Sequence, residues 1–362
     1  MSVKQHLILN GEGKGLPWMM AKGLLPTLVA RGDYTSCAWT LNRAYDVLCE
    51  GMQELYSTVN RPESDATPSR VLEHISNSVL IDYRAWHIRK PDYLEEFHRK
   101  AVKEIQFYHA FIPNHGLEAI KRKVLGSLAR TNGEANQRRE WDIIRPSLTT
   151  TVRYWVMEGF HQGTLYRNPA AGTNYLGQAI ALIKWGQTHW RRIPKEIKGE
   201  VFEETYLKRV QFLRLRFLLE QFDDADLPTR QAMYQEADGI VNETTGFQPS
   251  RERDTVLTAY SWYSARGYAL NLKARQYQAN GLYAFAGLSY KLSAECFAED
   301  DGNYIANLLS YVKSAEYIQS PSIEIQQEAL KKIRKVIPKL NYIWKAKKEV
   351  NDIDKTYYDQ FY

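Results

Sequence analysis

The chain has 362 residues, of which 44% are hydrophobic and 25% charged, so it holds enough apolar material for a buried core and is not an intrinsically disordered chain. Its net charge of +6, from 48 basic and 42 acidic residues, is too small an excess to be typical of a nucleic-acid-binding protein. The three cysteines, Cys37, Cys49 and Cys296, are widely spaced and form no CxxC pair, which argues against a disulfide framework or a zinc–thiolate site. We expect Cys37 and Cys49 to be buried thiols in a reducing compartment.

No targeting or membrane segment is visible in the sequence. The apolar run 7–9 is too short for a signal peptide, and no stretch approaches the roughly 20 apolar residues of a transmembrane helix. The chain ends in Asp359-Gln360-Phe361-Tyr362, which is not a prenylation box. These observations favour a cytoplasmic protein.

Helical patterns dominate the first half of the chain. Apolar residues recur at helical spacing over 34–59, 68–89, 93–111 and 117–128. Asp33 is placed to cap the first of these helices, because its side chain can accept hydrogen bonds from free backbone N–H groups. The polar stretch 61–68 predicts a loop, and 130–140 is the longest loop candidate in this half.

The second half repeats this pattern of helices separated by turns. Helices are predicted near 141–167, 169–191, 195–222, 228–244, 252–297, 303–319 and 322–350. The stretch 252–297 is longer than a usual helix, so Gly267 or Gly281 should mark a bend or break. Thr149 to Val152 is β-like locally but lies within a helical pattern, and strand signals are otherwise nearly absent. No 34-residue period is found, so the sequence predicts an all-α, irregular array of antiparallel helical hairpins with a tetratricopeptide-like core at most.

Motifs for catalysis, nucleotides or metals are weak. The run 11–15 (Gly-Glu-Gly-Lys-Gly) lacks the spacing of a phosphate-binding loop and a preceding buried strand. The eight histidines, among them His109, His115, His161 and His189, form no HExxH and no pair with a third ligand in register. We therefore expect no catalytic residue, no metal site and no cofactor.

Charged residues are expected on solvated surfaces. The acidic pairs are adjacent in sequence, so they do not form a carboxylate dyad: Glu95-Glu96, Glu203-Glu204, Asp223-Asp224 and Asp300-Asp301. Basic residues cluster over 191–192, 208–216, 331–335 and 345–348, where they indicate either solvated helix faces or stripes that meet an acidic helix or a lipid head group.

Several segments of the second half resemble the BRO-one domain family, which includes Alix, Rhophilin and the fungal pH-response scaffolds. The resemblance covers mainly 195–362. It is carried by Lys273 to Tyr283, by Gly302 to Leu308 with Ala315-Glu316, by Glu203 to Leu207 and by the Lys-rich stretch 345–358, where the family's terminal signature is altered. The resemblance implies one elongated, curved, banana-shaped domain over 1–362. Its parts would be a flexible 1–16, a divergent helical 17–140 and a family-like core 141–362.

The family resemblance also implies a function in partner binding. In this family a concave face receives the C-terminal amphipathic helix of an ESCRT-III core subunit, a helix-in-groove mode. The corresponding patch would lie around 174–190, with Leu182, Ile183 and Trp190 in apolar contact and Lys184 and Arg191 engaging acidic partner residues. Leu182 and Ile183 are equally compatible with an ordinary place in the core, and Gln178 lies near the family's usual aromatic position.

The expected protein is thus a non-catalytic adaptor or scaffold of endosomal sorting or membrane remodelling. It would be cytoplasmic and peripherally associated with the endosomal membrane, with contact to anionic lipid as a further expectation and no nucleic acid bound. A signalling scaffold of the same fold that binds a small GTPase or a pH-response partner is the alternative. An all-α enzyme is a third reading, and it requires a deep polar pocket with perturbed acid or base groups.

Overall fold

The computed structural model describes residues 16–57, 69–88, 90–111, 116–130, 134–250, 255–318 and 323–344. Every regular element within these residues is a helix and none is a strand, which confirms the predicted all-α class. The described residues form two compact units. The first comprises 43–217, and the second comprises the described residues up to 42 together with those from 218 onward.

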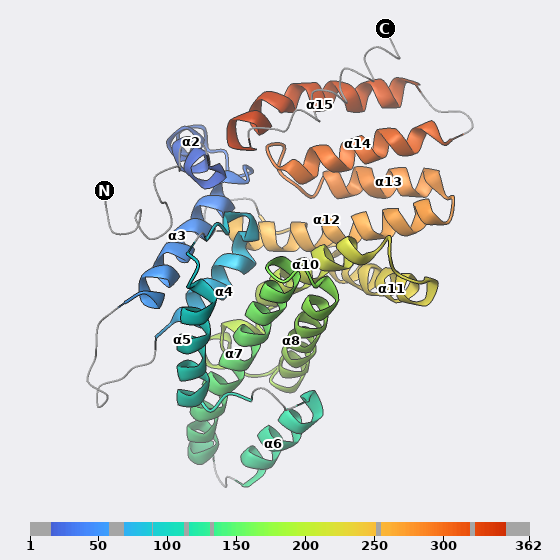
Figure 1. Ribbon diagram of the computed structural model, residues 1–362. Helices are drawn as coiled ribbons and strands as arrows, with labels where there is room; N and C mark the ends of the chain where they lie inside the picture. Colours follow the sequence, from blue (N-terminus) through green and yellow to red (C-terminus); the bar gives the residue numbers. More distant parts are fainter. Residues whose placement is uncertain are drawn as a thin grey trace. The chain divides into compact units, whose positions relative to one another are not determined.

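The first unit is built around one long helix, α7 (Figure 1). Its elements are α4 (Val71–Asp82), η2 (Tyr83–Ala85), α5 (Tyr93–Phe107), α6 (Leu117–Arg130), α7 (Glu134–Thr164), α8 (Pro169–His189), α9 (Lys195–Lys198) and η3 (Glu200–Phe202). Helices α3 (Ala38–Leu55) and α10 (Glu204–Gln221) contain the two division points. Helix α7 packs against α4, α5, α6 and α8, so its side chains lie at the centre of this unit's core.

Glycines allow α7 and α8 to pack closely. A Cβ atom on Gly172 of α8 would lie 2.8 Å from the carbonyl oxygen of Gly159 on α7, which is closer than real Cβ atoms approach a backbone. The same Cβ would lie 3.1 Å from the backbone nitrogen of Gly163 on α7. The two helices therefore form a hairpin with backbone nearly against backbone, and this fixes the position of α8 on α7.

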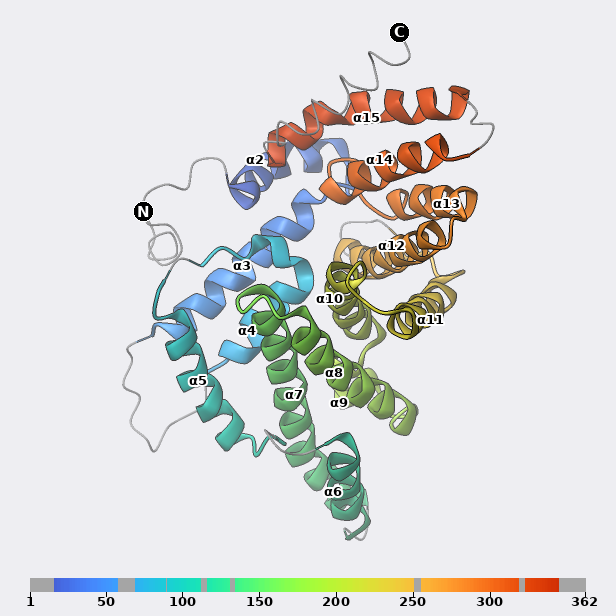
Figure 2. The same cartoon turned by 45° about the vertical axis from the view of Figure 1, so that its right-hand side comes forward.

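The second unit is a stack of helices that follow one another along the chain. Its elements are α2 (Pro17–Arg31), α11 (Leu227–Thr244), α12 (Val256–Ala279), α13 (Tyr283–Ala294), α14 (Gly302–Glu316) and α15 (Ile323–Trp344). Each of α11 to α14 packs on the next helix, and both views show α12, α13, α14 and α15 lying side by side (Figures 1 and 2).

Local signals set most helix boundaries in this stack. Asp226 and Asp301 accept hydrogen bonds from the backbone N–H groups of Thr229 and Asn303, as N-cap residues do. The predicted interruption of 252–297 falls at Gly281, whose φ of 74° is a left-handed conformation that glycine adopts without strain. Gly267 lies inside the continuous helix α12 instead, where it makes room for the ring of Phe297.

Two predictions about the first half of the chain are wrong. Asp33 does not cap the helix that follows: its carboxylate accepts from the backbone N–H of Thr35 at 3.0 Å, and α3 begins only at Ala38. The loop predicted for 130–140 is helical from Glu134, because α7 extends seven residues beyond its predicted start at 141 and packs as one continuous helix. Residue 140, the predicted boundary between the divergent and family-like parts, thus lies within α7.

The prediction of solvated acidic pairs is wrong for one pair. Asp300 and Asp301 are buried. Asp300 Oδ1 accepts from the backbone N–H of Cys37 at 2.9 Å, and its Oδ2 accepts from the hydroxyl of Ser36 at 2.5 Å. The buried carboxylate anchors the segment that leads into α3. Its hydrogen bonds from Ser36 and Cys37 take the place of the hydrogen bonds that an exposed carboxylate makes to water.

Part of the basic stretch 208–216 is also buried, although a solvated helix face was one of the two predictions for it. Lys208 is 1% exposed, and burial lowers the pKa of Arg209. Farther along α10, Arg214 donates to the carbonyl of Thr173, and the guanidinium of Arg216 lies 4.1 Å from the ring centre of Tyr83. The heads of Arg214 and Arg216 thus reach a carbonyl oxygen and an aromatic ring, while their long aliphatic stems pack on neighbouring side chains.

Other predictions concern single features. Cys37 and Cys49 are buried, as predicted. Thr149 to Val152 is helical within α7. Among the described helices, none is long and apolar enough to cross a membrane. The run 11–15 and the stretch 345–358 lie outside the described residues.

Candidate functional site

The residues predicted to bind a partner lie on and just after α8. Leu182 and Ile183 are completely buried in the core of the first unit. Lys184, the next residue, is exposed, as is Arg191 beyond the end of the helix. The residues predicted to make apolar contacts with a partner therefore face inward, and those predicted to make charged contacts face outward. Leu182 and Ile183 are core residues, which was the alternative prediction for them.

Trp190 is the C-terminal capping residue of α8 and belongs to an aromatic cluster. Its ring centre lies 4.4 Å from that of Trp141, 5.0 Å from that of Trp185 and 5.2 Å from that of Phe202. The ring is 6% exposed, so it offers almost no surface to a partner. Its packing secures the end of α8 against α7 and η3.

An apolar surface that sequence reasoning did not single out lies on α13. Phe285, Leu288 and Leu292 are 58%, 54% and 36% exposed. Their spacing of i, i+3 and i+7 places them on one side of the helix, and Leu282 just before the helix is 45% exposed as well. We call Phe285, Leu288 and Leu292 the α13 face. Large side chains aligned in this way are typical of a helix that receives another apolar element.

A shallow groove of about 110 Å³ adjoins the α13 face, in the part of the stack formed by α13, α14 and α15. Apolar atoms of Ala294, Leu308 and Ala329 contribute to its lining, together with the half-buried rings of Tyr304 and Tyr311. The charged residues at the groove are Lys291, Glu295, Glu328 and Lys332. Tyrosine beside apolar atoms and charge is a common composition for protein-binding surfaces.

Helix α15 adds positive charge next to this groove. Lys331, Lys332 and Lys335 are exposed on its surface. Lys332 also forms an ion pair with Glu328 at 3.2 Å, and Lys339 pairs with Glu299 at 2.6 Å. An apolar face beside a lysine-rich helix is complementary to an amphipathic segment with acidic flanks.

One cavity in the first unit has the polar lining that an enzyme would need. It measures about 230 Å³ and contains Glu104, whose pKa is raised to about 7 by burial. The Glu104 Oε1 atom accepts from the hydroxyl of Ser69 and from the backbone N–H of Val71, both at 2.8 Å. This carboxylate therefore caps the start of α4, which accounts for its burial without a substrate.

The guanidinium groups around the same cavity are also engaged. Arg153 donates to Glu200 at 2.8 Å and to Asn77 Oδ1 at 3.0 Å, so it joins separate parts of the unit. Arg70 forms an ion pair with Glu73 at 2.6 Å. Glu104, Arg70 and Arg153 thus all have partners within the protein, and these partners explain their positions at the cavity without a substrate.

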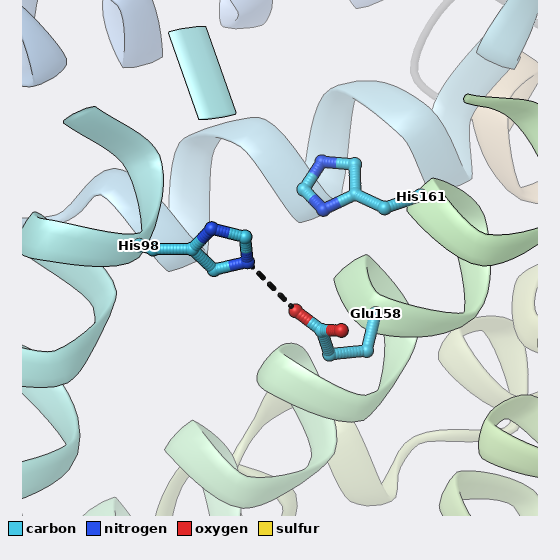
Figure 3. A group of neighbouring side chains, drawn as sticks. All are labelled: His98, Glu158 and His161. Carbon is cyan, nitrogen blue, oxygen red and sulfur yellow. Dashed lines mark hydrogen bonds and ion pairs between the residues drawn. The ribbon is translucent and has the colours of Figure 1, made fainter. Parts of the chain in front are cut away.

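Three potential metal ligands meet between α5 and α7, and Figure 3 shows them: His98, Glu158 and His161. His98 Nε2 lies 3.3 Å from Glu158 Oε1. His161 is fully buried, and burial lowers the pKa of its imidazole to about 3, so the ring is neutral at physiological pH. No local motif predicted this group, because His98 and Glu158 are 60 positions apart in the sequence.

Comparison with known proteins gives no relative for this chain. No family model, no curated protein and no solved structure matches it. The class of protein that the structure defines is an all-α protein with a stack of helices in its second unit.

Proposed function

We propose that this chain is a non-catalytic scaffold that binds an acidic amphipathic helix of a partner protein on the α13 face and the adjoining groove. The observation that carries this proposal is the exposure of Phe285, Leu288 and Leu292 on one side of α13. Apolar residues at i, i+3 and i+7 match the apolar stripe of another helix, and burying the exposed half of each side chain contributes about 1 kcal/mol.

The charge around the α13 face favours an acidic partner. Lys291 lies on α13 itself, and Lys331, Lys332 and Lys335 project from α15. Rim lysines of this kind accelerate association with an acidic segment and set its orientation, while the apolar residues supply most of the affinity.

The resemblance to BRO-one domains supports a particular partner, the C-terminal helix of an ESCRT-III core subunit. Such a helix is amphipathic and acidic, and two of the segments that carry the resemblance, 273–283 and 302–308, lie in α12 to α14 beside the proposed surface. Binding to ESCRT-III would bring the scaffold to the endosomal membrane in sorting or membrane remodelling.

The test is calorimetry of the full chain with peptides from ESCRT-III C-terminal tails. We expect saturable binding in the micromolar range that is lost in Leu288→Asp, because a carboxylate cannot be buried in an apolar contact without a large cost. Leu227→Asp is the matched control, since Leu227 is 75% exposed at the start of α11 and lies outside the α13 face.

A second variant tests the surface predicted on α8. Lys184→Glu combined with Arg191→Glu reverses the charge of its two exposed residues without touching the core. Unchanged binding in folded Leu288→Asp would rule out the α13 face, and loss of binding in the α8 variant would then place the partner there. Recovery of a small GTPase and no ESCRT-III subunit by co-purification would support the signalling scaffold instead.

A further inference from the structure

The cluster between α5 and α7 has the composition of a metal site. Glu158 and His161 are separated by three positions on α7, so their side chains project from neighbouring places on one side of the helix. His98 projects toward them from α5 (Figure 3). One ligand atom from each of these three residues lies within 4.8 Å of the others. Two imidazoles and one carboxylate are a donor set that zinc and related ions use in proteins.

His161 presents an unpartnered atom to this cluster. Its Nε2 atom lies 3.0 Å from the hydroxyl of Tyr93, whereas its Nδ1 atom is buried and has no hydrogen-bond partner. In Figure 3 the ring nitrogen nearest to Glu158 and His98 adjoins the ring carbon that carries the side chain, so this nitrogen is Nδ1. A buried ring nitrogen without a hydrogen-bond partner is unfavourable, and a ligand at this position would satisfy it.

We propose that His98, Glu158 and His161 bind a divalent transition-metal ion of the zinc type through His98 Nε2, the Glu158 carboxylate and His161 Nδ1. Bonds of about 2.0–2.1 Å at the tetrahedral angle place ligand atoms about 3.3 Å apart. His98 Nε2 and Glu158 Oε1 already have this separation, at 3.3 Å. Because the three ligand atoms lie within 4.8 Å of one another, rotations of the half-exposed His98 side chain and of Glu158 bring the ion within reach of His161 Nδ1.

The surroundings of His161 suit a metal ligand. When Nδ1 binds the ion, Nε2 carries the ring proton and donates it to the Tyr93 hydroxyl, so both nitrogens are satisfied. The rings of Phe97 and Phe160 lie 4.8 and 6.3 Å from the imidazole and hold it in a nearly fixed orientation. The Tyr93 hydroxyl can accept the Nε2 proton, so Tyr93 is a positioning residue that holds the His161 ring with Nδ1 toward the cluster.

The cluster is also accessible from solvent. The His98 side chain is 43% exposed and that of Glu158 is 10% exposed, so an ion reaches the site from the His98 side. Three protein ligands leave a fourth tetrahedral position for water. Without a metal, His98 Nε2 and Glu158 Oε1 form an ordinary contact at 3.3 Å, and this contact leaves the buried Nδ1 of His161 without a partner.

The test is calorimetry with Zn²⁺ on the full, tag-free chain after treatment with a chelator. We expect one equivalent to bind, with affinity reduced at least tenfold in His98→Gln, which removes the most exposed ligand and spares the core. Glu158→Gln should weaken binding similarly. His189→Gln is the control, because His189 is an exposed histidine of the same unit outside the cluster.

A second measurement reports the geometry directly. Co²⁺ bound by two imidazoles and a carboxylate in a four-coordinate site should give a visible absorption band in the unmodified chain, and this band should disappear in His98→Gln. Equal Zn²⁺ affinity in the unmodified chain and His98→Gln would overturn the proposal. So would the absence of Zn²⁺ binding to a chain whose circular dichroism shows it to be helical.

Discussion

Glu104 Oε1 accepts a hydrogen bond from the backbone N–H of Val71 at 2.8 Å, so a carboxylate on α5 caps the first turn of α4. Burial dominates the electrostatics of this group and raises its pKa to about 7, although Ser69, Val71 and Leu72 all donate to it and act in the opposite direction. The neighbouring charged groups that line the same cavity are Arg70, Glu73, Arg145 and Arg153.

Glu104 therefore makes the stability of the fold depend on pH. A carboxyl group whose pKa is raised on folding stabilises the folded state fully below its unfolded pKa, near 4.5, and loses this contribution as the pH rises through about 7. Between pH 5 and pH 8 the loss amounts to about 2 to 3 kcal/mol. Glu104→Gln should remove this part of the pH dependence in urea unfolding, because the amide keeps an acceptor oxygen but does not titrate. An identical pH profile in the variant would contradict the assignment.

The close contact of α7 and α8 predicts that Gly172→Ala is destabilising. The new methyl group would lie 2.8 Å from the carbonyl oxygen of Gly159, and two packed backbones cannot separate without loss of core contacts. We expect a loss of about 1 to 3 kcal/mol in the free energy of unfolding. Gly239→Ala in α11 is the control: nothing lies within 4 Å of its Cβ position, so it should stabilise the helix by about 0.5 to 1 kcal/mol. Equal effects of the two substitutions would argue against the close packing.

Ile183→Asp should unfold the first unit and not act as a selective binding variant. Ile183 is 0% exposed, and a buried carboxylate without a partner costs several kcal/mol. Lys184→Glu, one position along α8, should change stability by less than about 0.5 kcal/mol because its side chain is exposed. Circular dichroism and urea titration of both variants check this difference. A stable Ile183→Asp protein would mean that this part of α8 is open to solvent.

Asp300→Ala should destabilise the second unit, since the Ser36 hydroxyl and the Cys37 N–H would both lose their acceptor in a buried place. The expected cost is about 2 to 4 kcal/mol, measured as a shift of the urea midpoint. Glu299→Ala, at the preceding position, removes only the ion pair with Lys339, whose side chains are 47% and 56% exposed, and should cost less than about 1 kcal/mol. Comparable costs for the two variants would show that Asp300 is not an anchor.

Local sequence signals predicted the features that neighbouring residues determine. The start of α8 follows from Asn168 and Pro169, because an Asn side chain accepts from a helix N–H and proline suits the first turn. The break at Gly281 was one of two alternatives, and only a left-handed backbone conformation distinguishes it from Gly267. Such features depend on a few adjacent residues and are therefore readable from the chain alone.

Features that depend on residues distant in sequence were not predictable in the same way. Leu182 and Ile183 are apolar whether they face the core or a partner, so helical periodicity could not assign them. Asp300 resembles a solvated turn residue until Ser36 and Cys37 are brought beside it. His98 meets Glu158 and His161 only because α5 packs on α7.

The second unit is made from two separate parts of the chain, and this has a consequence for synthesis on the ribosome. Cys37 and its acceptor Asp300 are 263 positions apart. The ribosome adds about 5 to 20 residues per second, so roughly 10 to 50 s pass between the synthesis of Cys37 and that of Asp300. During that time the apolar side chains of α2, including Ala21 and Leu28, have no Ile343 or Ala298 to pack against. The apolar side of α2 thus lacks these partners while most of the chain is being made, whereas the core cluster built around α7 consists only of residues within 43–217.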